Sequence, residues 1–504
     1  MRYTVDLCKF IVAATKFNTW QESSFPDCHV TVQNNIDKEL RVNVSVNPDI
    51  EVCIYEHNIK NAASNYMCGI NIELVAQLVF QEIQVSVLVQ KPLKVVPCSH
   101  FFSNLGNSTR FSSYVFLDEA LDVPSLEASI KISVITSLGI PRTITKLAML
   151  PIHLVLESCT PEKDNKHKIT LVTNQPPIGL NNLFSDYNHD GQSSPNAIGF
   201  RSASGNAGAI LLAKSSERYR LQSDTFTMLS IMVEQLIVRL KKYYNNVIDF
   251  KISFNSSLPS SDILFYVNKH FETKLCINKL QGIVSQLSGQ FRLIQKRLIA
   301  KYRAKNTTSL KSLELLLNDT YLEIMETTEK LDNELEVLSK SQTNLSCALN
   351  LLKQLVELFA MDSDLLKMVH SAFCINVYDL DGQSWEDVMD ASLCYLLRTV
   401  MAKTEKDKLR APHTSFDEVK DLTKFEKHLS LVLERLSKHV GLKESDTVFE
   451  EVEAQKQDNT EIEEDNQRDE KPIGSQYGEI SLRLLSARKS LMKRHQIKDE
   501  PQNG

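Results

Sequence analysis

The sequence predicts a multidomain protein: an all-β immunoglobulin-like sandwich, then a small α+β layer domain, then an all-α region with a coiled-coil helix. Three observations predict this series. Apolar and polar residues alternate with period two in the first third of the chain, and mixed strand and helix patterns follow. An apolar stripe with steps of three and four then runs from Leu310 to Phe359. A length of 504 residues leaves room for three or four domains.

Residues 28–157 carry the pattern of antiparallel strands with one buried face, whereas residues 1–27 show no clear pattern and stay unassigned. Val42, Val44 and Val46, for example, alternate with polar residues, as in a sandwich strand with one wet face. Seven stretches have strand-like composition: 41–46, 51–55, 73–80, 83–90, 110–117, 130–134 and 143–156.

Residues 165–275 mix strand and helix patterns after a polar linker at 158–166, which predicts an α+β layer domain. Strands are expected at 168–173, 197–202, 209–214 and 249–255, and helices at 223–244 and 260–273. Gly205-Asn-Ala-Gly208 lacks the lysine and the spacing of a phosphate-binding loop, so it is predicted to be a hairpin turn.

Residues 276–441 are predicted to be helical throughout. No Gly or Pro interrupts the stripe from Leu310 to Phe359, so it predicts one helix with a coiled-coil seam, roughly 75 Å long. The other predictions here are a helix at 362–373, a helix at 385–404 capped by Ser384, and a capping box at 415–418 that opens a helix over 419–440, with Gly441 at its C-cap.

The seam of the long helix is the candidate partner interface. A helix of this length cannot bury its stripe inside a small domain of its own, so the stripe must lie along another helix, in this chain or in a partner. The candidate interface residues are Leu310, Leu313, Leu317, Tyr321, Ile324, Leu331, Leu335, Leu338 and Leu345.

Two charged segments are weighed as binding surfaces. The basic cluster Arg292, Lys296, Arg297, Lys301 and Arg303 is either a solvated helix face or a patch for an acidic protein or an anionic membrane surface. Residues 442–504 are acidic and poor in aromatics, which predicts a disordered tail, with a short basic helix at 479–495.

Several classes of function are disfavoured by composition and motifs. The net charge of -6 gives no basic signature for nucleic-acid binding. The 10 Cys form no CxxC pair and the 12 His show no metal spacing, so we predict buried thiols in a reducing compartment and no metal, cofactor or catalytic site. Asp186–Gly191 opens like a calcium loop, but Ala197 takes the position of the bidentate glutamate. We also expect no signal peptide, no membrane span and no small-molecule substrate.

Several long phrases resemble one known family. They are Arg218-Tyr-Arg-Leu-Gln-Ser223, the segment 290–306, Leu316-Leu-Asn-Asp-Thr-Tyr321, the segment 385–392 and the segment 428–438. These phrases are similar to the C-terminal half of the parathyroid-hormone-responsive B1 family, a subunit of the BBSome. The resemblance implies a γ-adaptin-ear-like sandwich, an α/β platform and a helical region. The family's N-terminal β-propeller has no counterpart here, so the chain is expected to be a fragment or a short form.

The resemblance also implies a function. The chain is expected to be a non-enzymatic scaffold subunit that carries membrane-protein cargo into and out of cilia. Its expected partners are the other BBSome subunits and cargo, with peripheral contact to an anionic membrane surface. The expected location is the cilium, the ciliary membrane, the basal body or centriolar region, and the cytoplasm. The alternatives are a vesicle-coat or adaptor appendage, a coiled-coil tether outside cilia, and an enzyme with an unrecognised site in the α+β domain.

Overall fold

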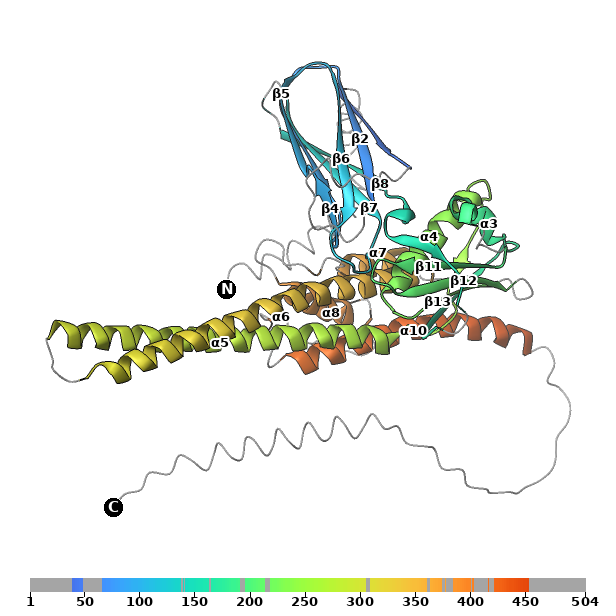
Figure 1. Cartoon of the computed structure of the whole chain (residues 1–504). Helices are drawn as coiled ribbons and strands as arrows, with labels where there is room; N and C mark the ends of the chain where they lie inside the picture. The colour runs from blue at the N-terminus through green and yellow to red at the C-terminus, as the bar shows by residue number, and fades with distance from the viewer. Residues whose placement is uncertain are drawn as a thin grey trace, which may run out of the picture. The chain divides into compact units, whose positions relative to one another are not determined.

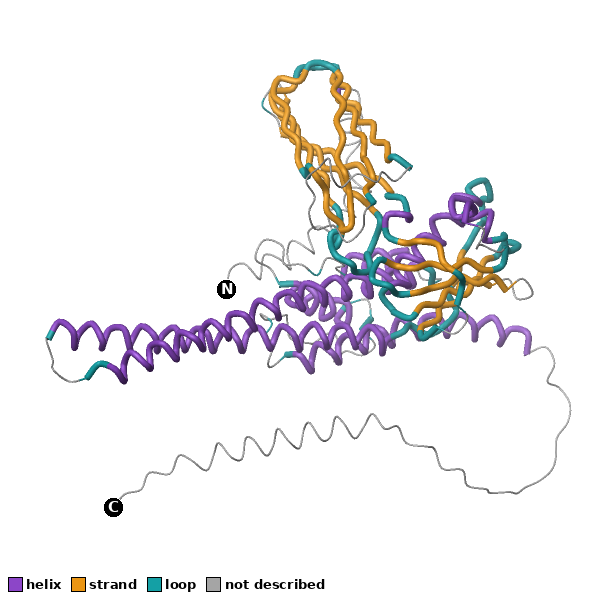
Figure 2. The backbone as a smooth tube through the Cα atoms, in the orientation of Figure 1, coloured by secondary structure: helices purple, strands orange, loops and turns teal. Residues whose placement is uncertain are grey.

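The structure is a computed structural model, and its described residues confirm the predicted fold class (Figures 1 and 2). The described residues are 39–48, 66–136, 139, 141–162, 165–190, 195–213, 218–304, 309–359, 363–373, 377, 384–399, 401–402, 416 and 421–452. The unassigned segment 1–27, the predicted strand at 51–55 and the predicted basic helix at 479–495 lie outside these ranges.

The sandwich consists of two four-stranded antiparallel sheets. One sheet has the order β1 (Leu40–Val46), β2 (Met67–Ala76), β6 (Ser108–Leu117) and β4 (Leu93–Val96). The other has the order β5 (Ser99–Leu105), β3 (Phe80–Leu88), β7 (Glu127–Thr136) and β8 (Pro141–Met149). The alternation predicted for β3 and β7 is confirmed, because Ile83, Val85, Ile130, Ile132 and Val134 are buried. These apolar faces form the core of the sandwich.

The single strand predicted at 73–80 is wrong. The structure ends β2 at Ala76 and begins β3 at Phe80, with the exposed side chains of Leu78 and Val79 between them. Two apolar strands meet here without a Gly or Pro to mark the turn, so composition alone runs them together.

The α+β domain is built on a six-stranded antiparallel sheet. Its order is β14 (Ile252–Ser253), β10 (His167–Thr173), β13 (Arg218–Ser223), β12 (Ala207–Ala213), β11 (Ala197–Ser202) and β9 (Leu156–Cys159). Helix α4 (Met228–Tyr243) contacts β12 and β13 and presents Leu229, Val233 and Leu236 to the core. Two short helical segments, α3 (Leu180–Leu183) and η2 (Ser185–Asp190), lie between β10 and β11.

Several predicted boundaries in this domain are corrected. Part of the expected linker is strand β9, which pairs with β11. The helix expected from Ser223 begins at Met228, because the residues before it form β13. The strand expected at 249–255 is limited to Ile252–Ser253. The turn predicted at 205–208 lies earlier, at 203–206 between β11 and β12, because Ala207 and Gly208 already belong to β12. Gly205 in this turn has a φ of 86°, which favours glycine.

The helical region begins earlier than predicted. Helix α5 (Ser260–Arg303) is continuous, so the predicted division between residues 275 and 276 falls inside it. The long helix is confirmed as α6 (Lys311–Glu357), followed by α7 (Ser363–Ala372), α8 (Trp385–Arg398) and α10 (Leu422–Val452). Ser384 caps α8 as predicted, by accepting from the Asp387 backbone N–H. The predicted C-cap at Gly441 is wrong, since α10 continues through it. No described helix is both long and apolar enough to cross a bilayer.

Glycine 199 permits the pairing of β9 with β11, because a Cβ there would collide with the Cys159 carbonyl and lie 2.8 Å from Pro161 N. We expect Gly199→Ala to lower the free energy of unfolding by about 2 kcal/mol through overpacking. Gly282 on α5 has open space around it, so Gly282→Ala should raise that free energy by about 0.5–1 kcal/mol. Urea denaturation measures both changes, and equal effects of the two alanines would contradict this role of Gly199.

Candidate protein-interaction site

The loop between β6 and β7, which we call the junction loop (residues 118–126), links the two sheets of the sandwich and contacts the α+β domain. Its Asp122 is buried and accepts hydrogen bonds from Ser202 Oγ at 2.8 Å and Thr227 Oγ1 at 2.5 Å. Ser204 and Thr225 add two longer ones at 3.3 Å. Because a buried carboxylate needs such donors, this carboxylate fixes the loop against the end of β11 and the start of α4.

The same loop holds the base of α6. The Pro124 carbonyl accepts hydrogen bonds from Asn350 Nδ2 at 2.5 Å and from Ser230 Oγ at 3.2 Å. The buried Cys347 thiol donates to the Asp122 carbonyl at 3.4 Å. One loop therefore contacts α4 and α6 through its backbone as well as through its side chains.

Glu234 on α4 is half-buried next to this loop. Its Oε1 accepts from Ser125 Oγ at 2.8 Å. Burial raises the pKa of Glu234 to about 7, even though the hydrogen bond from Ser125 favours the charged form. The side chain therefore takes up a proton well above the usual range of a carboxyl.

A second buried polar contact joins α5 to α8. His270 Nε2 lies 2.7 Å from Glu386 Oε1, and Lys274 Nζ lies 2.7 Å from Glu386 Oε2. Burial opposes ionisation of Glu386, but His270 and Lys274 hold its pKa at about 2. The side chains of His270 and Glu386 are both buried.

Helices α5 and α6 form an antiparallel hairpin, which Figure 1 shows as two long helices side by side. Leu317, Ile324, Leu331 and Leu338, spaced seven residues apart, are half-buried. Thr320 and Thr327 lie between them and are buried, with their hydroxyls bonded to carbonyls four residues back. These small side chains let α5 approach closely, so α6 finds its companion helix within the chain.

The predicted seam therefore divides into two groups. One group faces α5 or the core: Leu310, Leu313, Leu317, Ile324, Leu331 and Leu338 are half-buried, and Leu345 is buried. Tyr321 and Leu335 belong to the other group, because they are 50% and 42% exposed. Tyr321 follows the buried Thr320 and Leu335 follows the half-buried Glu334, so a pattern of three-and-four steps fits both rows equally well.

The outer half of the hairpin exposes further large apolar side chains. Leu315, Tyr321, Leu322 and Met325 are each at least half exposed and fall within about 120° of the α6 circumference. We call these four residues the distal apolar face. On α5, Leu293, Ile299 and Tyr302 are also exposed. Clustered exposed apolar side chains mark a protein-interaction surface.

The predicted basic cluster lies on the same stretch of α5. Arg292, Lys296, Arg297 and Arg303 are exposed, whereas Lys301 is half-buried. Exposed cations thus alternate with the exposed apolar side chains of α5. Such a surface fits an acidic or amphipathic binding partner.

Four domain models of one family match the chain in series. They are the PTHB1 GAE domain at residues 64–148, the PTHB1 platform domain at 151–256, the PTHB1 hairpin at 257–360 and the PTHB1 C-terminal helix bundle at 361–436. Together the four matches span residues 64–436, so this part of the chain is similar to PTHB1 domain by domain. Their limits agree with the structure, since the platform includes β9 and the hairpin begins just before α5.

Whole proteins named PTHB1, or homologs of it, are also similar to the chain. The chain is 28% identical to Protein PTHB1 of Mus musculus over 417 residues and 29% identical to Protein PTHB1 of Homo sapiens over 416 residues. Each alignment covers 80% of this chain and 47% of the relative. A pthb1 homolog of Caenorhabditis elegans is 24% identical over 44% of this chain and 29% of its own length. The chain thus spans about half the length of the mouse and human proteins.

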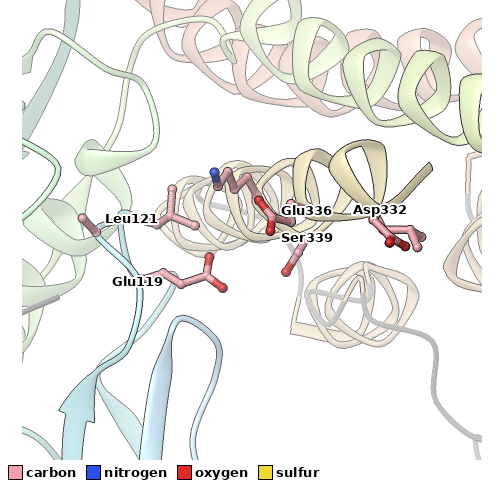
Figure 3. Close-up of a pocket in the computed structure, with 8 residues that line it drawn as sticks. Glu119, Leu121, Asp332, Glu336 and Ser339 are labelled. Carbon is pink, nitrogen blue, oxygen red and sulfur yellow. The ribbon is translucent and has the colours of Figure 1, made fainter. Parts of the chain in front are cut away.

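A recess of about 800 Å³ lies between the junction loop of the GAE domain and the PTHB1 hairpin. Figure 3 shows Glu119 and Leu121 of the loop facing Glu336 and Ser339 of α6. Leu335, which the sequence placed in the seam, lines this recess instead. The sequence offered no signal for the recess, because its two walls lie more than 200 residues apart.

Two carboxyl groups of the platform with shifted pKa values, Asp186 and Glu234, make structural contacts. Asp186, at the start of the segment that resembles a calcium loop, lies 2.6 Å from both Arg239 Nη1 and Nη2. Burial opposes its ionisation, but Arg239 and His153 hold the pKa of Asp186 below its usual range. Asp186 and Glu234 are each explained by a structural contact and give no support to an enzymatic site in this domain.

We expect Asp122→Ala to lower the free energy of unfolding by about 3 kcal/mol, because it leaves the buried hydroxyls of Ser202 and Thr227 without their acceptor. Asp118→Ala is the matched control in the same loop. Asp118 forms an ion pair with the exposed Lys94 at 2.6 Å, and loss of such a surface pair should cost less than about 1 kcal/mol. Urea denaturation of both variants measures the difference. A loss for Asp122→Ala as small as the control's would contradict the role of Asp122.

The raised pKa of Glu234 makes stability depend on pH. The folded chain binds this proton more tightly than the unfolded chain, so the contribution is complete below about pH 4.5 and is lost as pH rises through about 7. The free energy of unfolding of Glu234→Gln, measured relative to the parent, should therefore be higher at pH 8 than at pH 5 by about 2–3 kcal/mol. Chemical denaturation at both pH values tests this, and parallel pH profiles would contradict it.

Proposed function

We propose that the chain acts as a non-enzymatic scaffold subunit of the BBSome, a coat-like complex that carries membrane-protein cargo to and from cilia. The observation that carries the proposal is the series of four PTHB1 domains over residues 64–436. The expected sites of action are the cilium, the ciliary membrane, the basal body or centriolar region, and the cytoplasm. Cargo and the other BBSome subunits are the proposed partners.

The distal apolar face is the proposed contact with another subunit. Leu322 and Met325 are 57% and 53% exposed, and α5 leaves them uncovered. Burying them against a partner helix would remove apolar surface from water, at about 25 cal/mol per Å². The exposed basic residues of α5 would add attraction to an acidic partner or to an anionic membrane surface.

The GAE domain supports a second candidate function. An ear-type domain at residues 64–148 also suits an adaptor appendage of a vesicle coat, or a tether, that acts outside cilia. The two functions differ in the proteins that bind the hairpin, so one purification separates them.

The double variant in which Leu322 and Met325 are both changed to Glu places two charges on the distal apolar face and leaves α5 unchanged. We expect recovery of BBSome subunits with the tagged chain from ciliated cells to fall at least about tenfold, as loss of some 1.4 kcal/mol of binding requires. Leu147→Glu, at an exposed leucine of β8, is the matched control and should leave recovery unchanged. Quantitative mass spectrometry measures both.

Unchanged recovery of BBSome subunits from the double variant would rule out this face as the contact. Recovery of vesicle-adaptor subunits in place of BBSome subunits by the parent chain would favour the second candidate function. Circular dichroism of the double variant verifies that the hairpin remains helical.

A further inference from the structure

Helices α8 and α10 bring three metal-ligating side chains together inside the C-terminal bundle. Asp390 and Cys394 are four residues apart on α8, and His428 faces them from α10. The Asp390 and Cys394 side chains are buried, and that of His428 is only 12% exposed. Their ligand atoms all lie within 4.8 Å of one another.

Two of the three separations between these atoms are close to those of tetrahedral coordination, and the third, from Cys394 Sγ to Asp390 Oδ1, is longer at 3.9 Å. Cys394 Sγ and His428 Nδ1 are 3.6 Å apart, and His428 Nδ1 and Asp390 Oδ1 are also 3.6 Å apart. Zinc binds sulfur at about 2.3 Å, imidazole nitrogen at about 2.0 Å and carboxylate oxygen at about 2.1 Å. At tetrahedral angles, such bonds place pairs of ligand atoms about 3.4–3.6 Å apart.

The three side chains supply zinc with a neutral set. One thiolate and one carboxylate balance the two charges of Zn²⁺, and neutral imidazole adds none. Balance matters here, because an uncompensated charge in a buried site is costly. Both Asp390 oxygens lie close to Cys394 Sγ, at 3.9 and 4.0 Å, so a bidentate carboxylate can fill the fourth position.

We propose that Asp390, Cys394 and His428 form a Zn²⁺ site that joins α8 to α10. The sequence predicted no metal site, since His428 is 34 residues from Cys394 and shares no zinc motif with it. The site complements the contact one turn earlier on α8, where Glu386 meets α5. Helix α8 would then be fixed on α5 by an ion pair and on α10 by a metal.

Metal analysis of the purified full chain tests the site. After incubation with Zn²⁺ and removal of the excess, we expect about one tightly held zinc per chain by mass spectrometry of the metal. Cys394→Ser and His428→Asn should each retain at least about tenfold less zinc, since each removes one of the three protein ligands. Cys276→Ser changes another free helical cysteine, on α5, and should retain the parent's zinc.

Cobalt substitution reports on the ligand atoms. Co²⁺ bound to the parent chain should give a thiolate charge-transfer band in the near ultraviolet, which Cys394→Ser abolishes and Cys276→Ser keeps. A chelator should lower the melting temperature of the parent and of Cys276→Ser. The chelator experiment needs only the parent and Cys276→Ser, so it still tests the site if Cys394→Ser is too unstable to purify.

Two results would overturn the proposal. The first is a parent chain that holds no zinc and gives no cobalt band, which would make the cluster a hydrogen-bonded one in which His428 pairs with Asp390. The second is a cobalt band that survives in Cys394→Ser, which would place the metal elsewhere.

Discussion

A buried carboxylate in the junction loop is the constraint on which the rest of the structure depends. Asp122 lies away from water, so it requires donors, and the hydroxyls that supply them belong to β11 and to the segment before α4. The next turn of the same loop offers the Pro124 carbonyl to Asn350 on α6. The sandwich, the platform and the base of the hairpin therefore share one set of polar contacts.

This arrangement explains how a long hairpin can serve as an arm. Near its base, α6 is buried by the junction loop and by α4, as the exclusion of Leu345, Leu349 and Leu352 from solvent shows. Toward its far end α5 is the companion helix among the described residues, and small residues such as Thr320 occupy half of the seam. A two-helix arm cannot cover its outer sides, so apolar side chains such as Leu322 remain exposed. Such exposure would suit the scaffold function proposed above.

Local patterns predicted the elements well where one face alone decides burial. The alternation in β3 and β7 and the helix of α6 depend on period, and the structure confirms both, although Tyr321 and Leu335 of the predicted stripe are exposed. The sequence could not predict which row of α6 faces α5. Thr320 and Tyr321 are adjacent in the sequence, and only packing against the partner helix decides which of them is buried. The contacts of Asp122 join residues that are separated by 80 and 105 positions in the sequence, so they leave no local signal. The approach of His428 to Cys394 leaves none either. The sequence prediction ended a helix near the expected domain boundary at residue 275. In the structure, α5 continues through this residue, because the helix begins before the boundary and extends beyond it.

Amide hydrogen exchange of the full chain tests the shared junction most directly. If the contacts of Asp122 and Pro124 couple the domains, then β7, α4 and residues 345–356 of α6 should open with the same free energy, within about 1 kcal/mol. Opening of β7 at a clearly lower free energy than α4 would show that the sandwich unfolds by itself, which would contradict the account.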